Sequence, residues 1–90
     1  MVFLHTWEMM NMQAITTRIL PATNTKPTRI KAFSASGISV TVSADHSSHQ
    51  GAVRALCQKL NWTGRMIGGG IGNGGDMVFV FVDDAATFEL

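Results

Sequence analysis

Residues 38–60 read ISVTVSADHSSHQGAVRALCQKL, and the spacing of the apolar residues changes within this stretch. Ile38, Val40 and Val42 alternate with polar residues, which is typical of a strand with one buried face. Further along, apolar residues recur at helical spacing and form a single stripe: Ala52, Val53, Leu56, Cys57 and Leu60. The stretch therefore predicts a strand over 38–43 followed by a helix over about 48–60.

Both ends of this helix carry capping residues. Either Ser47 or Ser48 can cap the start, and Ser47 with Gln50 three residues later fits a capping box. Lys59 lies near the end, where a cation suits the helix dipole. Asn61 can close the helix, since it tolerates the left-handed backbone of a C-terminal cap.

Two strands are expected before residue 38. Ile15, Thr17 and Ile19 alternate with their neighbours in residues 14–20, and Pro21 ends that strand. Residues 21–27 form a loop with a proline at each end. Residues 28–34 alternate again, so Ile30 and Ala32 share one face while Arg29, Lys31 and Phe33 share the other.

The C-terminal part resembles a hairpin in its pattern. Residues 65–71 are a candidate strand thinned by glycines, and Asn73-Gly74 favours a type I′ turn, which needs positive φ at both central residues. Residues 77–82 (MVFVFV) are apolar at every position. Such a strand is expected inside the sheet and buried on both faces.

These elements predict an α+β fold of order β-β-β-α-β-β, with a mostly antiparallel sheet of about five strands and one helix on one face. The domain spans residues 14–83, between an N-terminal arm (1–13) and an acidic tail (84–90) that we expect to fray. One helix covers only one face of a sheet. The arm, sheet curvature or a second copy of the chain would cover the other, and a homodimer is slightly favoured.

The arm, residues 1–13, has two interpretations. It lacks the basic start, apolar run and cleavage site of a secretory signal. Either translation naturally starts at Met12, or the arm packs its apolar residues on the domain or on a partner: Val2, Phe3, Leu4 and Trp7.

Composition narrows the class of protein. Ninety residues, 46% of them hydrophobic, are too apolar for a disordered chain and too few for two cores. There is no run of about 18 apolar residues, so no membrane span is expected. The single cysteine permits no intrachain disulfide. We expect a cytoplasmic protein.

The net charge of +1 conceals a segregation of charge. All seven basic residues lie between Arg18 and Arg65, and Asp45 is the single acid in that segment. A strand face that carries basic residues and an aromatic residue has three interpretations. It binds the phosphates and bases of a nucleic acid, it binds an acidic protein partner, or it is simply exposed to solvent. The candidate binding residues are Arg18, Lys26, Arg29, Lys31 and Phe33.

The glycine-rich stretch, residues 68–75, does not match a phosphate-binding motif. A Walker loop needs Lys and then Ser or Thr after its last glycine, but Asp76 follows here. A dinucleotide fingerprint needs a helix after it, but a strand follows. The glycines permit a bent hairpin tip or close backbone approach. A tip that faces a partner is the alternative, with Gly70 and Asn73 as its candidate residues.

We find no catalytic constellation and expect no enzyme activity, cofactor or metal. His46 and His49 are spaced for a shared metal with Asp45 or Cys57 as a third ligand, but Cys57 falls in the apolar stripe. Two exposed histidines that respond to pH are the simpler interpretation. Trp62 either covers the helix end or is an exposed binding residue.

Two segments resemble small proteins of unknown function carried by bacterial phages and plasmids: residues 15–32 (ITTRILPATNTKPTRIKA) and 49–62 (HQGAVRALCQKLNW). A glycine-rich stretch and residues 78–82 (VFVFV) extend the resemblance over most of residues 12–82. It implies a segment that starts near Met12 and transfers no catalytic residue. It also implies a compact protein that blocks or adapts host machinery, including host defence.

The sequence thus predicts a small non-enzymatic module that binds a protein partner. Single-stranded nucleic-acid binding by the same strand face is the alternative.

Overall fold

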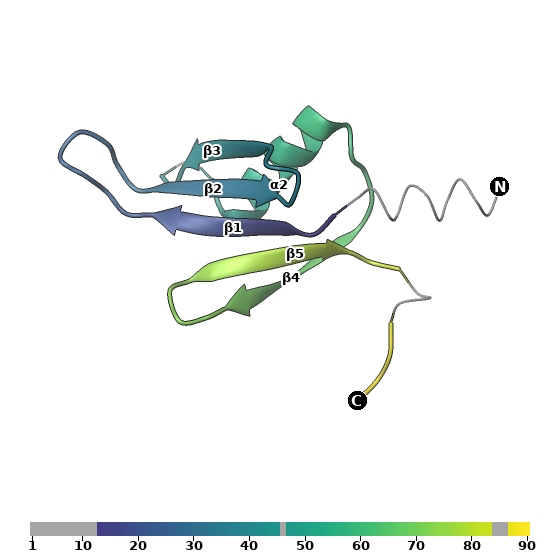
Figure 1. Cartoon of the computed structure of the whole chain (residues 1–90). Helices are drawn as coiled ribbons and strands as arrows, with labels where there is room; N and C mark the ends of the chain where they lie inside the picture. The colour runs from purple at the N-terminus through teal and green to yellow at the C-terminus, as the bar shows by residue number, and fades with distance from the viewer. Residues whose placement is uncertain (1–12, 46, 84–86) are drawn as a thin grey trace.

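The computed structural model describes residues 13–45, 47–83 and 87–90 (Figure 1). The interpretations of the N-terminal arm as far as residue 12, of His46 and of residues 84–86 lie outside this part of the chain.

Across the described residues the chain forms five strands and one helix in the order β-β-β-α-β-β, which confirms the predicted fold class. The bounds are β1 Ile15–Leu20, β2 Arg29–Ser34, β3 Ser39–Ser43, α2 His49–Leu60, β4 Met66–Ile71 and β5 Asp76–Phe81. All neighbouring strands are antiparallel, and the sheet order is β3-β2-β1-β5-β4. The C-terminal hairpin therefore joins the N-terminal meander through β1 and β5 (Figure 1).

The core lies between α2 and one face of the sheet. The helix packs on β1, β2 and β3, so it covers that half of the sheet more fully than β4 and β5. The buried apolar residues come from both layers: Ile15, Ile30, Ala32, Ala52, Val53, Leu56 and Phe79. The predicted alternation of β2 is confirmed, because Ile30 and Ala32 are buried while Arg29, Lys31 and Phe33 are only half-buried. Among the described residues, no helix is long and apolar enough to cross a membrane.

The ends of α2 follow from their capping residues. Ser48 is the N-cap, and its hydroxyl accepts a hydrogen bond from the N–H of Gly51 at 3.2 Å. The alternative cap with its Ser47–Gln50 box is therefore not the one used. Asn61 adopts the left-handed backbone at φ 58°, and the N–H of Trp62 donates to the carbonyl of Cys57, as predicted for a helix closed at Asn61.

Two predictions about the C-terminal hairpin are wrong. β5 lies inside the sheet as expected, but it is not buried on both faces: Phe79 is 5% exposed and Val80 is 43% exposed. The reason is that α2 covers one face of the sheet. The turn is also not a type I′ turn at Asn73-Gly74, because positive φ occurs at Gly72 and Gly75 instead. Four residues connect the strands, and the outer two glycines adopt the left-handed conformation.

Candidate binding surface

The second face of the sheet carries the predicted basic residues. We call it the open face. It has a basic half, built by Arg18, Arg29, Lys31 and Phe33 on β1 and β2, and an apolar half, built by Ile67, Ile71, Val78 and Val80 on β4 and β5. The register pairs Arg18 with Lys31 and Thr16 with Phe33, so residues distant in sequence share one surface. The sequence predicted the basic half, whereas the apolar half was expected to be covered.

Two cations lie over one aromatic ring in the basic half. The guanidinium carbon of Arg18 is 5.4 Å from the centroid of the Phe33 ring, and Nζ of Lys31 is 5.7 Å from it. Cation–π attraction of this kind is worth about 0.5–1 kcal/mol at an exposed site. Phe33 therefore holds two positive charges close together on adjacent strands.

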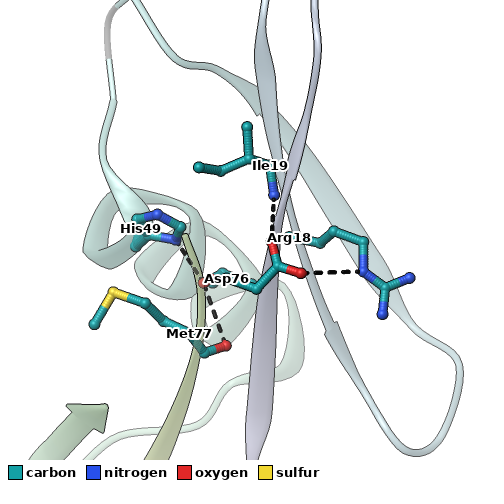
Figure 2. A network of polar contacts seen from close by, with 6 residues as sticks. Arg18, Ile19, His49, Asp76 and Met77 are labelled. Atoms are coloured by element: carbon teal, nitrogen blue, oxygen red, sulfur yellow. Dashed lines mark hydrogen bonds and ion pairs between the residues drawn. The ribbon is translucent and has the colours of Figure 1, made fainter. Parts of the chain in front are cut away.

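Asp76 positions Arg18 (Figure 2). The carboxylate accepts a hydrogen bond from the N–H of Ile19 at 3.1 Å through Oδ1, and Oδ2 lies 3.7 Å from Nε of Arg18. The Arg18 side chain remains 59% exposed. This exposed ion pair is worth little for stability, but it ties the orientation of Arg18 to the junction of β1 and β5.

Arg29 carries a shielded donor that has no partner among the described residues. It is half-buried, and its Nε is shielded from water without a hydrogen-bond partner in the part of the chain that the structure describes. A shielded guanidinium donor without an acceptor costs free energy. An acceptor that a partner supplied to Arg29 would offset that cost.

The apolar half exposes large aliphatic side chains. Ile67 is 64% exposed, and Ile71 and Val80 are 42% and 43% exposed. They lie on the same face of β4 and β5, because Ile67 pairs with Val80, and Ile71 is four residues further along β4. Ile67 and Val80 are neighbours across the two strands, and exposed apolar side chains that share one face are typical of an interaction surface.

The other predicted binding residues lie elsewhere. Lys26 is exposed in the loop between β1 and β2, where its N–H donates to the hydroxyl of Thr23. Gly70 belongs to β4 and is separated from β2 by β1 and β5. Asn73 is exposed in the turn between β4 and β5. This turn lies at the same end of the sheet as the loop between β1 and β2 (Figure 1). The structure therefore brings Arg18, Arg29, Lys31 and Phe33 together, but not Gly70.

On the helix side of the sheet, a groove of about 460 Å³ lies between α2 and the β4–β5 hairpin. Trp62 forms one wall, half-buried, with its ring edge-on to Phe81 at a centroid distance of 6.1 Å. Cys57 also lines the groove, and burial raises the pKa of its thiol. A raised pKa keeps the sulfur protonated near neutral pH, so Cys57 is a poor nucleophile there.

His49 makes a structural contact that sequence reasoning missed. Its Nδ1 lies 2.6 Å from the hydroxyl of Thr17, a fully buried residue of β1. The same hydroxyl also approaches the carbonyl of Met77. The contact joins the first turn of α2 to the sheet. The contact between His49 and Thr17 depends on strand register, which a single sequence does not reveal.

In the described residues no three side chains of the metal-binding types come together.

No family model matches the chain, and no similar protein was found among curated proteins or solved structures.

Proposed function

We propose that the chain is a non-enzymatic binding module, and that its open face binds a protein segment in which acidic residues accompany apolar ones. The observation that supports this most strongly is the division of one sheet face into a basic half and an apolar half. Carboxylates of the partner pair with Arg18, Arg29 and Lys31. Its apolar side chains cover Ile67, Ile71 and Val80.

The cations that lie over the Phe33 ring favour a protein partner over a single strand of nucleic acid. Proteins that bind single strands stack bases on exposed aromatic rings. Here Arg18 and Lys31 already lie over the Phe33 ring, within 6 Å of its centroid. The aliphatic side chains of the apolar half also offer no aromatic platform. The positive charge alone suits phosphates, so nucleic-acid binding is the second candidate.

The role that we propose for such a module is that of an accessory or inhibitor protein of a mobile element. It rests on the resemblance of residues 15–32 and 49–62 to phage and plasmid proteins. The division of the open face into a basic and an apolar half supports the binding step of this proposal and not its biological setting.

Selection from a displayed library of peptides tests the binding proposal. We expect the wild-type chain to enrich peptides that combine Asp or Glu with apolar residues. The double variant Arg29→Glu/Lys31→Glu should bind the enriched peptides at least about tenfold more weakly, because two attractive charges become repulsive. Its fold should be intact, since neither side chain belongs to the buried core.

The matched control is Arg54→Glu/Lys59→Glu, which changes net charge equally but lies on α2. It should bind as the wild type does. Absence of any enriched peptide, or equal losses in both double variants, contradicts the proposal. A mixed-sequence DNA single strand is tested in parallel. Tight binding that weakens steeply with salt would favour the second candidate, because phosphate contacts release counterions.

A further inference from the structure

The two edges of the sheet are unequally protected. β3 and β4 are the edge strands. At the β3 edge, Nζ of Lys59 donates to the carbonyl of Ser39 at 3.3 Å, and a lysine at an edge opposes pairing with another strand. β4, with the sequence MIGGGI, contains no charge and no proline, and its residues from Ile67 onward are exposed. The β4 edge is therefore open to another strand.

The hydrogen-bonding groups that β4 turns outward follow from its pairing with β5. The N–H of Val82 donates to the carbonyl of Arg65, directly beside the pair Met66–Phe81. Antiparallel ladders alternate between bonded and non-bonded pairs. Hence the backbone N–H and C=O groups of alternate residues point toward β5: those of Ile67, Gly69 and Ile71. The N–H and C=O groups of the residues between them point toward the free edge: those of Met66, Gly68 and Gly70.

The sequence of β4 is symmetric about Gly69. Residues 67–71 read IGGGI, so an antiparallel copy centred on Gly69 aligns Ile67 with the partner's Ile71. Both isoleucines lie on the open face, and this register makes them a non-bonded pair, in which side chains approach most closely. The outward groups of Gly68 meet those of the partner's Gly70. A shift by one residue would lose both isoleucine pairs.

The charges at the ends of the hairpin suit the same arrangement. Arg65 precedes β4, and Asp76 begins β5 beside the other end of β4. An antiparallel arrangement brings each Arg65 to the partner's Asp76 end, rather than to the partner's Arg65. β4 itself carries no charge, so no like charges meet at its centre.

We propose that two copies of the chain pair through β4, antiparallel about a two-fold axis at Gly69, and so form one ten-stranded sheet. This interface is self-complementary, as a two-fold interface must be. It joins the apolar halves of the two open faces at the centre and leaves a basic half at each end. The proposal concerns an edge of the sheet and does not depend on the proposed function.

Light-scattering mass of the full chain tests the dimer. The wild type should have twice the chain mass of 9.7 kDa. Gly70→Pro removes an outward N–H from each copy, and proline is tolerated at a strand edge. The loss of two hydrogen bonds should weaken association by roughly thirtyfold. Gly70→Ala keeps the N–H, its added methyl meets nothing within 4 Å, and it should remain a dimer.

A cross-link tests the register and does not rely on the proline variant. In a Cys57→Ala background, Gly69→Cys places the two thiols opposite each other at the axis, at a separation that a disulfide accepts. Mild oxidation should link the copies. Thr41→Cys, exposed at the middle of the β3 edge, is the matched control and should stay unlinked.

Three results would overturn the proposal: a wild-type chain that remains a monomer up to its solubility limit, a folded Gly70→Pro variant that dimerises as tightly as the wild type, or equal cross-linking of the Gly69→Cys and Thr41→Cys variants. A dimer that survives Gly70→Pro would assign self-association to another surface, such as the open face.

Discussion

Thr17 and His49 are 32 residues apart in the sequence, and their side chains meet at 2.6 Å beneath the first turn of α2. Thr17 is fully buried, so its hydroxyl needs a partner inside the protein. The helix start, which Ser48 caps, is thereby joined to the middle of the sheet.

A double-mutant cycle with Thr17→Val and His49→Ala should reveal coupling between these residues. We expect each single variant to lower the free energy of unfolding, and the coupling to be about 0.5–1.5 kcal/mol, the usual net worth of a hydrogen bond. Urea unfolding measures it. Strictly additive losses would show that the contact contributes nothing to stability.

Gly68 and Gly70 should respond in opposite ways to the same substitution. A methyl at Gly68 would lie 2.6 Å from Cδ2 of the buried Phe79 ring, whereas a methyl at Gly70 meets nothing within 4 Å. Gly68→Ala should therefore cost about 1–3 kcal/mol, as overpacking does. Gly70→Ala should be neutral or stabilise by up to about 1 kcal/mol. Thermal and urea unfolding compare the two, and equal effects would contradict the close packing at Gly68.

Asn61 closes α2 in the left-handed conformation. Asn61→Ala should lower the free energy of unfolding by about 1 kcal/mol, because a Cβ disfavours this backbone. Asn61→Gly should preserve the stability or raise it slightly, since glycine adopts the conformation freely. Comparison of the urea-unfolding midpoints of the two variants with that of the wild type checks this. An Asn61→Ala variant more stable than the wild type would be inconsistent with the observed cap.

Burial raises the pKa of the Cys57 thiol. We expect the native chain to react with iodoacetamide near pH 8 more slowly than the urea-unfolded chain, because less thiolate is present. The sign for stability follows from the same shift. Above the ordinary thiol pKa of about 8.5, the unfolded chain loses its proton first, so stability falls as pH rises. Equal reaction rates in both states would contradict the burial of Cys57.

The order of elements was predictable because local signals agree. Alternation over β2 and β3, helical spacing from Ala52 to Leu60, and Asn61 at the helix end each follow from short-range physics. The type of the turn between β4 and β5 was not predictable. Residues 72–75 hold three glycines and Asn73, and their sequence does not decide which of them takes positive φ.

The exposure of Val80 was missed for a different reason. An apolar strand shows that its side chains favour burial, but it does not show which layer covers them. Sequence placed Arg29, Lys31 and Phe33 on one face, because a strand alternates. Sequence did not show that Arg18 lies opposite Lys31 and pairs with Asp76, or that Gly70 lies away from this surface. These features depend on strand register and strand order, which arise from non-local pairing.

Amide NMR of the full chain, titrated with a peptide of alternating Glu and Leu, tests whether the open face binds a protein segment. We predict that the amide shifts concentrate on β1, β2 and the β4–β5 hairpin, at residues such as Arg18, Lys31 and Val80, and that the Arg29→Glu/Lys31→Glu variant loses them. Shifts confined to α2 and the groove beside Trp62, or the same shifts in the variant, would contradict binding by the open face.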